Sequence, residues 1–344
     1  VLEIARVLNN LIKKRVLPKP KRSIRFMLGW ECYSLIGYLT KDKRAEPVAG
    51  LTMDGLGLDP LKYDAPIGIH STPDSNPSYV DTLLEEIAKS YLREKRNLPI
   101  WKLFYFASGD SLPSDSCFNV PMPYLYQPCY TIWHTSIDTP EKLMPESLKW
   151  SAVIGATYLY FLANGGYKEA IWLAEKVCEK YQKKLISAKG IEMLHYQRDR
   201  GMQALNSVRK LLTDKEKKKI KPTLNILTKG ITNQTIVVKK RLKVKKSRKF
   251  TPLEKKASRM IPKRLIPGIL TLQTLPEEVK DSCKWGPGYQ VLIKPILWTD
   301  GKRNLLEIAK LLHLETGRKT NLKDLIDCYE FLEKYGYVKI KREK

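Results

Sequence analysis

The chain has 344 residues, of which 43% are hydrophobic, and this size and composition predict two or three globular domains rather than a mainly disordered protein. No apolar run reaches the ~18 residues of a membrane-spanning helix and no signal peptide is recognisable, so we expect a cytoplasmic protein without a membrane partner. The six cysteines form no C-x-x-C pair, which argues against a zinc ribbon and fits reduced thiols. The formal net charge is +26, and residues 209–264 carry most of it, with 21 Lys/Arg against three acids.

Helices and strands alternate in the first half of the chain. Apolar residues at helical spacing predict a helix over residues 2–15, which Pro18 and Pro20 end. The predicted strands are residues 24–28, 48–53, 103–107 and 121–126. The further predicted helices are residues 34–40, 79–95, 145–163, 168–187 and 190–212. This alternation predicts an α/β sheet.

Two of the predicted strands end on a carboxylate. The run at 24–28 leads into Gly29-Trp30-Glu31, and the run at 48–53 leads into Asp54-Gly55. Ligands bind at the carboxyl ends of strands in open α/β sheets, so Glu31 and Asp54 are candidates for a metal or acid/base site. The alternative is that both acids only cap turns.

Four segments carry a family resemblance by their order and spacing. They are SIRFMLGWECYSLIGYL, VAGLTMDGLG, PSDSCFNVPMPYLYQ and IWHTSIDTPEKLMPESL. Together they resemble the co-catalytic dizinc aminopeptidases, a family that includes bacterial leucyl-type enzymes and glutaminyl cyclases. The resemblance covers roughly residues 1–165. It implies a three-layer α/β/α domain, two zinc ions, and release of N-terminal amino acids from a peptide substrate.

The resemblance implies roles for four residues. Glu31 matches the general base, which takes a proton from metal-bound water. Asp54 and His134 match zinc ligands, although an Asp in a turn and a lone His are also common as structural residues. Cys32 stands where the family has a second ligating Glu. A thiolate can bind zinc, but we favour a buried thiol in a site that has lost a metal.

Other matching residues imply supporting roles. Asp115 matches the Asp of the family's Ser-Asp loop, with an expected loop-orienting role, and Asp110 is an alternative register for that position. Asp138 and Thr139 are expected to shape the turn after His134, with Asp138 as a partner behind the ligand. His70 has no counterpart and is expected to be a loop residue.

The resemblance also shows which ligands are missing. The family's first ligand His and its bridging Asp lie before the helix that opens this chain. The 344 residues of this chain therefore cannot complete a two-zinc site. We expect either a longer natural protein or a truncated, inactive relative. The early strands of the sheet would be missing too, which would leave sheet edges exposed or covered by another chain.

Residues 209–275 read as a basic linker, in which alternation over 231–244 suggests a β-hairpin arm. Its basic side chains are candidates for binding nucleic acid or an acidic partner. These candidates are Lys239, Lys240, Arg241, Lys243, Lys245 and Lys246. Aromatic residues are nearly absent from the segment, so base stacking is not supported, and a solvated linker is the alternative.

The last part of the chain resembles the winged-helix module appended to some members of this peptidase group. DGKRNLLEIAKLL and LIDCYEFLEKYGYVKI carry the resemblance. They predict helices over 305–312 and 322–335 and a strand over 337–341. The second helix carries four acids, which suit a phosphate-lined groove poorly. We therefore expect protein docking or homo-oligomerisation rather than DNA reading.

The expected organisation has three parts. Residues 1–208 form a peptidase-like α/β domain, 209–275 a linker or arm, and 276–344 a small winged-helix domain. The expected function is a zinc-dependent aminopeptidase-like hydrolase, inactive if its missing ligands are absent. The alternative is a non-catalytic peptidase-fold protein that binds a protein partner or nucleic acid.

Overall fold

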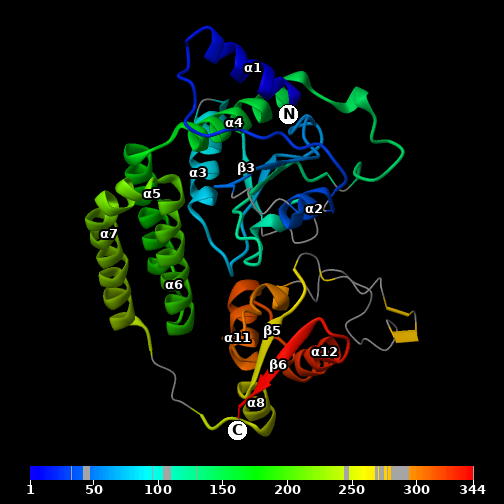
Figure 1. Cartoon of the computed structure of the whole chain (residues 1–344), viewed down its shortest axis with the longest axis vertical. Helices are drawn as coiled ribbons and strands as arrows, with labels where there is room; N and C mark the ends of the chain where they lie inside the picture. Colours follow the sequence, from blue (N-terminus) through cyan, green and yellow to red (C-terminus); the bar gives the residue numbers. More distant parts are fainter. Residues whose placement is uncertain are drawn as a thin grey trace.

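The computed structural model describes residues 1–31, 33–41, 47–94, 96–103, 110–129, 131–243, 248–267, 270, 275–276, 278–279 and 294–343. The fold is mixed α/β, as the alternation of elements predicts. A small sheet with its helices forms the upper part of Figure 1, three long helices lie beside it, and a smaller C-terminal unit lies below. No helix in the described part of the chain is long and apolar enough to cross a membrane.

The sheet of the upper part is small and mixed. Within the described ranges its strands follow the order β1-β4-β2-β3. They are β1 (Thr52–Met53), β2 (Ile67–His70), β3 (Ile100–Leu103) and β4 (Tyr124–Tyr126). β4 runs parallel to β1 and antiparallel to β2, and β2 runs parallel to β3. The two strands predicted over 48–53 and 121–126 are thus present in shortened form.

Helices and short turns surround this sheet. The α-helices are α1 (Leu2–Lys13), α2 (Tyr33–Lys41), α3 (Tyr79–Ala88) and α4 (Pro145–Asn164), and α3 continues as a π-helix, η1 (Lys89–Glu94). Three 3-10 turns are η2 (Leu112–Ser114), η3 (Pro140–Lys142) and η4 (Val208–Leu211). α4 packs against both α1 and α3. The helices predicted in these regions are confirmed.

The strand predicted over 24–28 is wrong. These residues form no strand, and residues 25–31 are exposed. The apolar, β-branched run favours extended backbone, but a strand is stable only where a neighbouring strand pairs with it. Of the strand predicted over 103–107, only Leu103 lies in the described residues, where it is part of β3. β2 was not predicted, because it is four residues long and lies in a proline-rich stretch.

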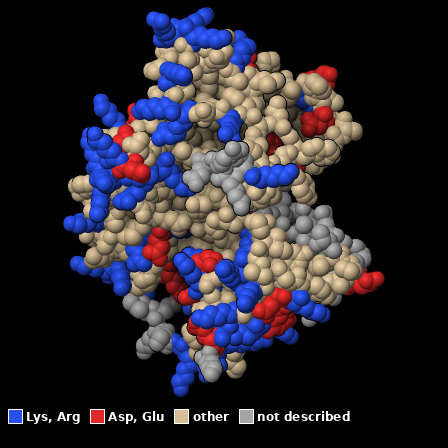
Figure 2. Space-filling view, in the orientation of Figure 1, with Lys and Arg blue, Asp and Glu red and all other residues tan. Residues whose placement is uncertain are grey.

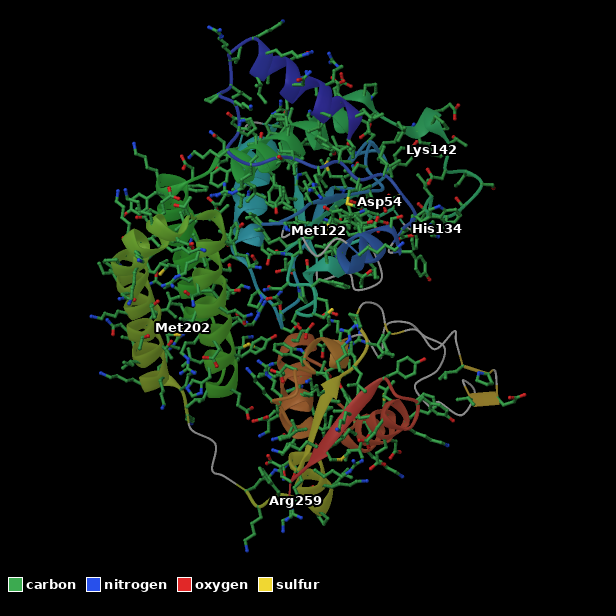
Figure 3. All side chains as sticks on the ribbon, viewed as in Figure 1. Asp54, Met122, His134, Lys142, Met202 and Arg259 are labelled. Atoms are coloured by element: carbon green, nitrogen blue, oxygen red, sulfur yellow. The ribbon has the colours of Figure 1, made fainter. Side chains whose placement is uncertain are left out.

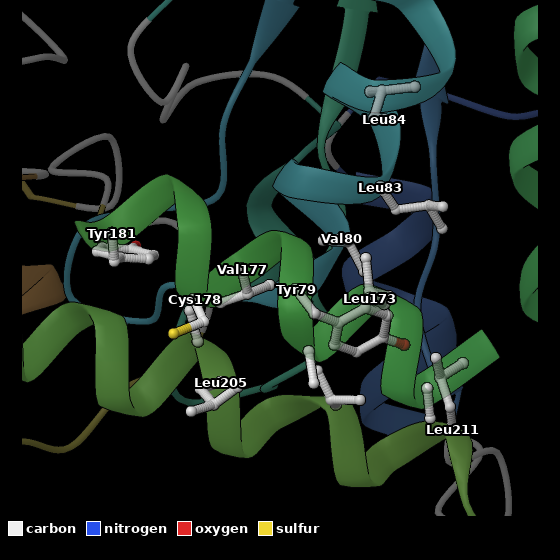
Figure 4. Close-up of a cluster of buried hydrophobic side chains, with 14 of the residues drawn as sticks. Tyr79, Val80, Leu83, Leu84, Leu173, Val177, Cys178, Tyr181, Leu205 and Leu211 are labelled. Carbon is white, nitrogen blue, oxygen red and sulfur yellow. The ribbon is translucent and has the colours of Figure 1, made fainter. Parts of the chain in front are cut away.

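Three long helices pack side by side (Figure 1). They are α5 (Tyr167–Ile186), α6 (Ile191–Ser207) and α7 (Asp214–Arg241), and two of them, α5 and α6, contact α3. Figure 4 shows Tyr79 of α3 next to Leu173 of α5, with Leu83 and Leu84 further along α3 in the same apolar cluster, and all four side chains are fully buried. The helices predicted over 168–187 and 190–212 are therefore confirmed as part of the main core.

The β-hairpin predicted over 231–244 is wrong, because these residues lie mostly within the helix α7. Thr213 caps the helix: its hydroxyl accepts a hydrogen bond from the backbone N–H of Glu216, whose carboxylate accepts one in return. Ile220, Leu224 and Ile231 are buried against the neighbouring helices. Residues 214–241 are thus part of the globular fold rather than a linker.

The C-terminal unit has its own apolar core. It contains α8 (Pro252–Ser258), β5 (Met260–Arg264), α11 (Leu305–Thr316), α12 (Leu322–Lys334) and β6 (Val338–Arg342). β5 pairs antiparallel with β6. The helices and the last strand agree with the prediction, whereas α8 and β5 come from a region predicted as linker. Tyr196 of α6 lies in the same core, 6.3 Å between ring centroids from Trp298.

Candidate functional site

Asp54 lies at the carboxyl end of β1, where the sequence places it (Figure 3). The Tyr124 hydroxyl donates a 2.5 Å hydrogen bond to Asp54 Oδ2. The backbone N–H of Gly55 donates to Asp54 Oδ1 over 2.7 Å, and the φ of +57° at Gly55 favours a glycine. The carboxylate is therefore oriented by β4 and by the turn that follows β1.

Glu31 shares its electrostatic environment with three other candidate groups. Partial burial raises the pKa of its carboxyl, repulsion from Asp110 and Asp54 raises it further, and His134 acts in the opposite direction. Residues from four separate parts of the chain thus act on one another. Burial also raises the pKa of Tyr124, with contributions from its bond to Asp54 and from the charge of Glu31.

A cavity of about 680 Å³ adjoins this group. It is lined by residues 22–30, residues 47–54 and Met122, among others. Two acids, Asp54 and Asp110, are part of this lining. Figure 3 shows Asp54 and Met122 in this part of the molecule. The volume falls within the usual range for pockets that bind small ligands. Asp54 and Asp110 therefore lie beside a space that a ligand could occupy.

His134 lies in an exposed turn with a φ of +57°. Its ring stacks on Trp133, with 3.9 Å between the centroids. The backbone N–H of Asp138 donates to the carbonyl of Thr135 over 3.1 Å, and Thr139 precedes η3. Asp138 and Thr139 thus lie in the turns after His134, where the resemblance places them.

Asp115 lies away from this group. It is buried and forms an ion pair with Arg264 of the C-terminal unit. Its Oδ1 also accepts a 3.3 Å hydrogen bond from the backbone N–H of Cys117, which fits a loop-orienting role. Asp110, the alternative to Asp115 for the family's Ser-Asp loop position, contributes to the raised pKa of Glu31.

The sequence interpretation missed His70. It is the last residue of β2 rather than a loop residue, and its ring lies 5.6 Å from that of Tyr124 and 5.9 Å from that of Tyr126. These two tyrosines lie on β4, next to Asp54. No signal in the sequence links a lone histidine in a proline-rich stretch to this cluster, because the link depends on the pairing of β2 with β4.

The donor set fits a zinc site only in part. Asp54 and His134 offer oxygen and nitrogen ligands of the kind that zinc takes, and a cation would relieve the carboxylate repulsion at Glu31. However, the described ranges contain no group of three or more His, Cys, Asp or Glu side chains that could hold a metal ion. The predicted ligand Cys32 lies outside the described residues.

Comparisons with known proteins identify no family: no protein-family model, no curated protein and no solved structure matches the chain. The aminopeptidase resemblance therefore depends on the order and spacing of the four quoted segments.

Proposed function

We propose that this protein is a zinc-dependent aminopeptidase-like hydrolase that releases N-terminal amino acids from peptides. The observation that supports it is that Asp54, Asp110 and His134 all act on the pKa of Glu31, although the sequence separates them widely, and that Asp54 and Asp110 line one cavity. In this proposal Glu31 is the general base, and Asp54 and His134 hold metal. The upper part of the molecule would then be the three-layer α/β/α domain of that family.

The chemistry of the group suits such a reaction. A zinc ion would supply an activated water and polarise the peptide carbonyl. A carboxylate with a raised pKa is a stronger base than an ordinary glutamate, which favours proton abstraction by Glu31 near neutral pH. Asp110 borders the cavity and could bind the α-ammonium group of a peptide. Zinc sites use at least three protein ligands, so the proposal requires a ligand beyond Asp54 and His134.

The test measures zinc content and hydrolysis of an aminoacyl-p-nitroanilide from pH 5 to 9. Glu31→Gln should retain zinc but lower kcat/KM by about 10²- to 10⁴-fold. Asp54→Asn and His134→Gln should each lower zinc affinity. The base acts when ionised, so wild-type kcat/KM should fall as pH drops through the raised pKa of Glu31.

Asp64→Asn is the matched control for these variants. Asp64 is exposed and has a φ of +45°, a conformation that asparagine tolerates. This variant should keep both zinc and activity. Wild-type protein that binds no zinc, or a Glu31→Gln variant with full activity, would contradict the proposal.

We also propose that the C-terminal unit is a winged-helix module that serves protein docking. The order α8-β5-α11-α12-β6, in which β5 and β6 pair antiparallel, supports this assignment. Two of the acids on α12 form ion pairs within the unit: Glu330 with Lys256 at 2.7 Å and Glu333 with Arg342 at 2.6 Å. An acidic α12 would repel a phosphate backbone, so docking to protein is favoured over DNA reading.

A second candidate function is supported by the basic surface of α7. This helix carries nine Lys/Arg against two acids, and most of its lysines are exposed. Figure 2 shows basic side chains gathered along the edge formed by the long helices. Such a surface fits a non-catalytic protein that binds nucleic acid through phosphates. Lys239, Lys240 and Arg241 end the helix, Lys243 follows it, and Lys245 and Lys246 lie outside the described residues.

An electrophoretic shift assay with duplex DNA and single-stranded RNA tests this candidate. Binding should weaken steeply with salt, and Lys239→Glu/Lys240→Glu should reduce the salt slope by about two, one for each lost phosphate contact. The matched control is Lys13→Glu/Lys14→Glu, a charge reversal at two exposed lysines at the end of α1. An equal loss of binding in both double variants, or no shift at low salt, would exclude α7 as the binding surface.

A further inference from the structure

Within the described residues, β1 pairs along one of its two edges. The backbone N–H groups of Gly50, Thr52 and Asp54 donate to carbonyls of residues 121–125, over 2.9, 3.1 and 3.2 Å. Backbone groups alternate sides along a strand, so those of Leu51 and Met53 point to the opposite edge. In the part of the chain that the structure describes, no strand follows on that side, because β1 ends the order β1-β4-β2-β3.

The segment that contains β1, residues 47–54, lines the 680 Å³ cavity, and residues 22–30 line it as well. This second segment contains the apolar run at 24–28, which has the composition of a strand but does not form one. Phe26, Met27 and Leu28 are 37%, 40% and 72% exposed. Two segments with strand-like sequences thus face a space that neither fills.

Asp54 follows β1 directly, and both Asp54 and Asp110 line the cavity. The helix α2 lies between the run at 24–28 and β1, and a helical crossover of this kind joins segments that run in the same direction. A chain parallel to β1 would place its C-terminal end next to Asp54 and Asp110.

We propose that this cavity accepts an extended segment of another polypeptide as an additional parallel β-strand. The segment pairs with the backbone of Leu51 and Met53 and covers Phe26–Leu28. The strand-like runs 24–28 and 48–53 are five and six residues long, which matches the ordinary length of a strand. A strand buried on both faces is apolar along its length, and the acids select a basic residue at its C-terminal end. The partner therefore supplies about five apolar residues followed by Arg or Lys.

Amide hydrogen exchange with synthetic peptides tests this proposal. The probe is an N-acetylated, C-amidated peptide of five Val/Ile residues followed by Arg. We expect at least tenfold slower exchange at the amides of Leu51 and Met53 with peptide in excess. The fluorescence of Trp30, which is 85% exposed and lines the cavity, should shift to shorter wavelength, and Trp30→Phe should remove this change.

Two altered peptides serve as controls without any change to the protein. N-methylation at alternate residues removes the backbone donors, and it should abolish the protection of Leu51 and Met53. Replacing the C-terminal Arg by Glu should weaken binding at least tenfold. No protection by the parent peptide, or equal protection by the N-methylated one, would overturn the proposal. Acetylation prevents the probe from acting as an aminopeptidase substrate, so the result does not depend on the proposed hydrolase activity.

Discussion

Gly201 lies where α6 packs against α5, and a Cβ at this position would lie 2.8 Å from Cγ and 2.9 Å from Cβ of Tyr181. These atoms belong to the inner part of a buried side chain, so they cannot yield without moving α5. We expect Gly201→Ala to lower the free energy of unfolding by about 1–3 kcal/mol, although alanine favours a helix. Urea unfolding followed by circular dichroism measures this difference.

Gly37 provides the matched control, because it also lies within a helix but has no atom within 4 Å of a built Cβ. Only the helix preference operates there. Gly37→Ala should therefore raise the free energy of unfolding by about 0.5–1 kcal/mol. If both variants changed the free energy of unfolding in the same direction, the close contact between Gly201 and Tyr181 would not explain the result.

Single residues differ in how far the sequence reveals their surroundings. Asp54 follows β1 directly, so a local pattern was sufficient to place it at the end of a strand. The surroundings of Asp115 depend on Arg264, which lies 149 residues further along the chain. The interaction of Asp110 with Glu31 likewise depends on how two loops fold together. Long-range contacts of this kind leave no local signal.

At the scale of elements, packing decides between helix and strand. The β-branched residues between 231 and 238 favour a strand by intrinsic preference. However, buried Ile220, Leu224, Ile231 and Val238 follow helical spacing, and the capping box at Thr213 starts a helix. Contacts with α5 and α6 favour the helix here. The sequence contains the capping-box residues Thr213 and Glu216. Giving them more weight than the β-branched residues predicts the helix α7.

Strands depend even more on distant partners. The pairing of β5 with β6 joins residues 260–264 to residues 338–342, so β5 could not be recognised from its own sequence. The run at 24–28 shows the reverse case, in which strand-like composition lacks a neighbouring strand. Helices make their hydrogen bonds locally, which explains why the predicted helices over 145–163 and 168–187 agree closely with α4 and α5.

At the scale of the whole molecule, polar contacts join the C-terminal unit to the rest. Asp115 pairs with Arg264, and their side chains are only 4% and 8% exposed. The rings of Tyr196 and Trp298 also face one another across the junction, with 6.3 Å between their centroids. On its own side the Tyr196 hydroxyl donates to Asp74 over 2.5 Å, and within the C-terminal unit the Trp298 indole N–H donates to Glu315 over 2.9 Å. Burial raises the pKa of Glu315, with a further contribution from the charge of Asp74. The two units thus meet through charges withdrawn from water.

The Asp115–Arg264 pair gives the sharpest test of this junction. Arg264→Met would leave a buried carboxylate without its ion-pair partner, and we expect a loss of about 3–5 kcal/mol in the free energy of unfolding by urea. Lys263→Met changes the neighbouring exposed side chain on β5 and should cost less than about 0.5 kcal/mol. In Asp115→Asn/Arg264→Met the unpaired charge is removed as well, so this double variant should recover part of the loss. If it is as unstable as the two single variants combined, the destabilisation comes from lost packing rather than from a buried charge.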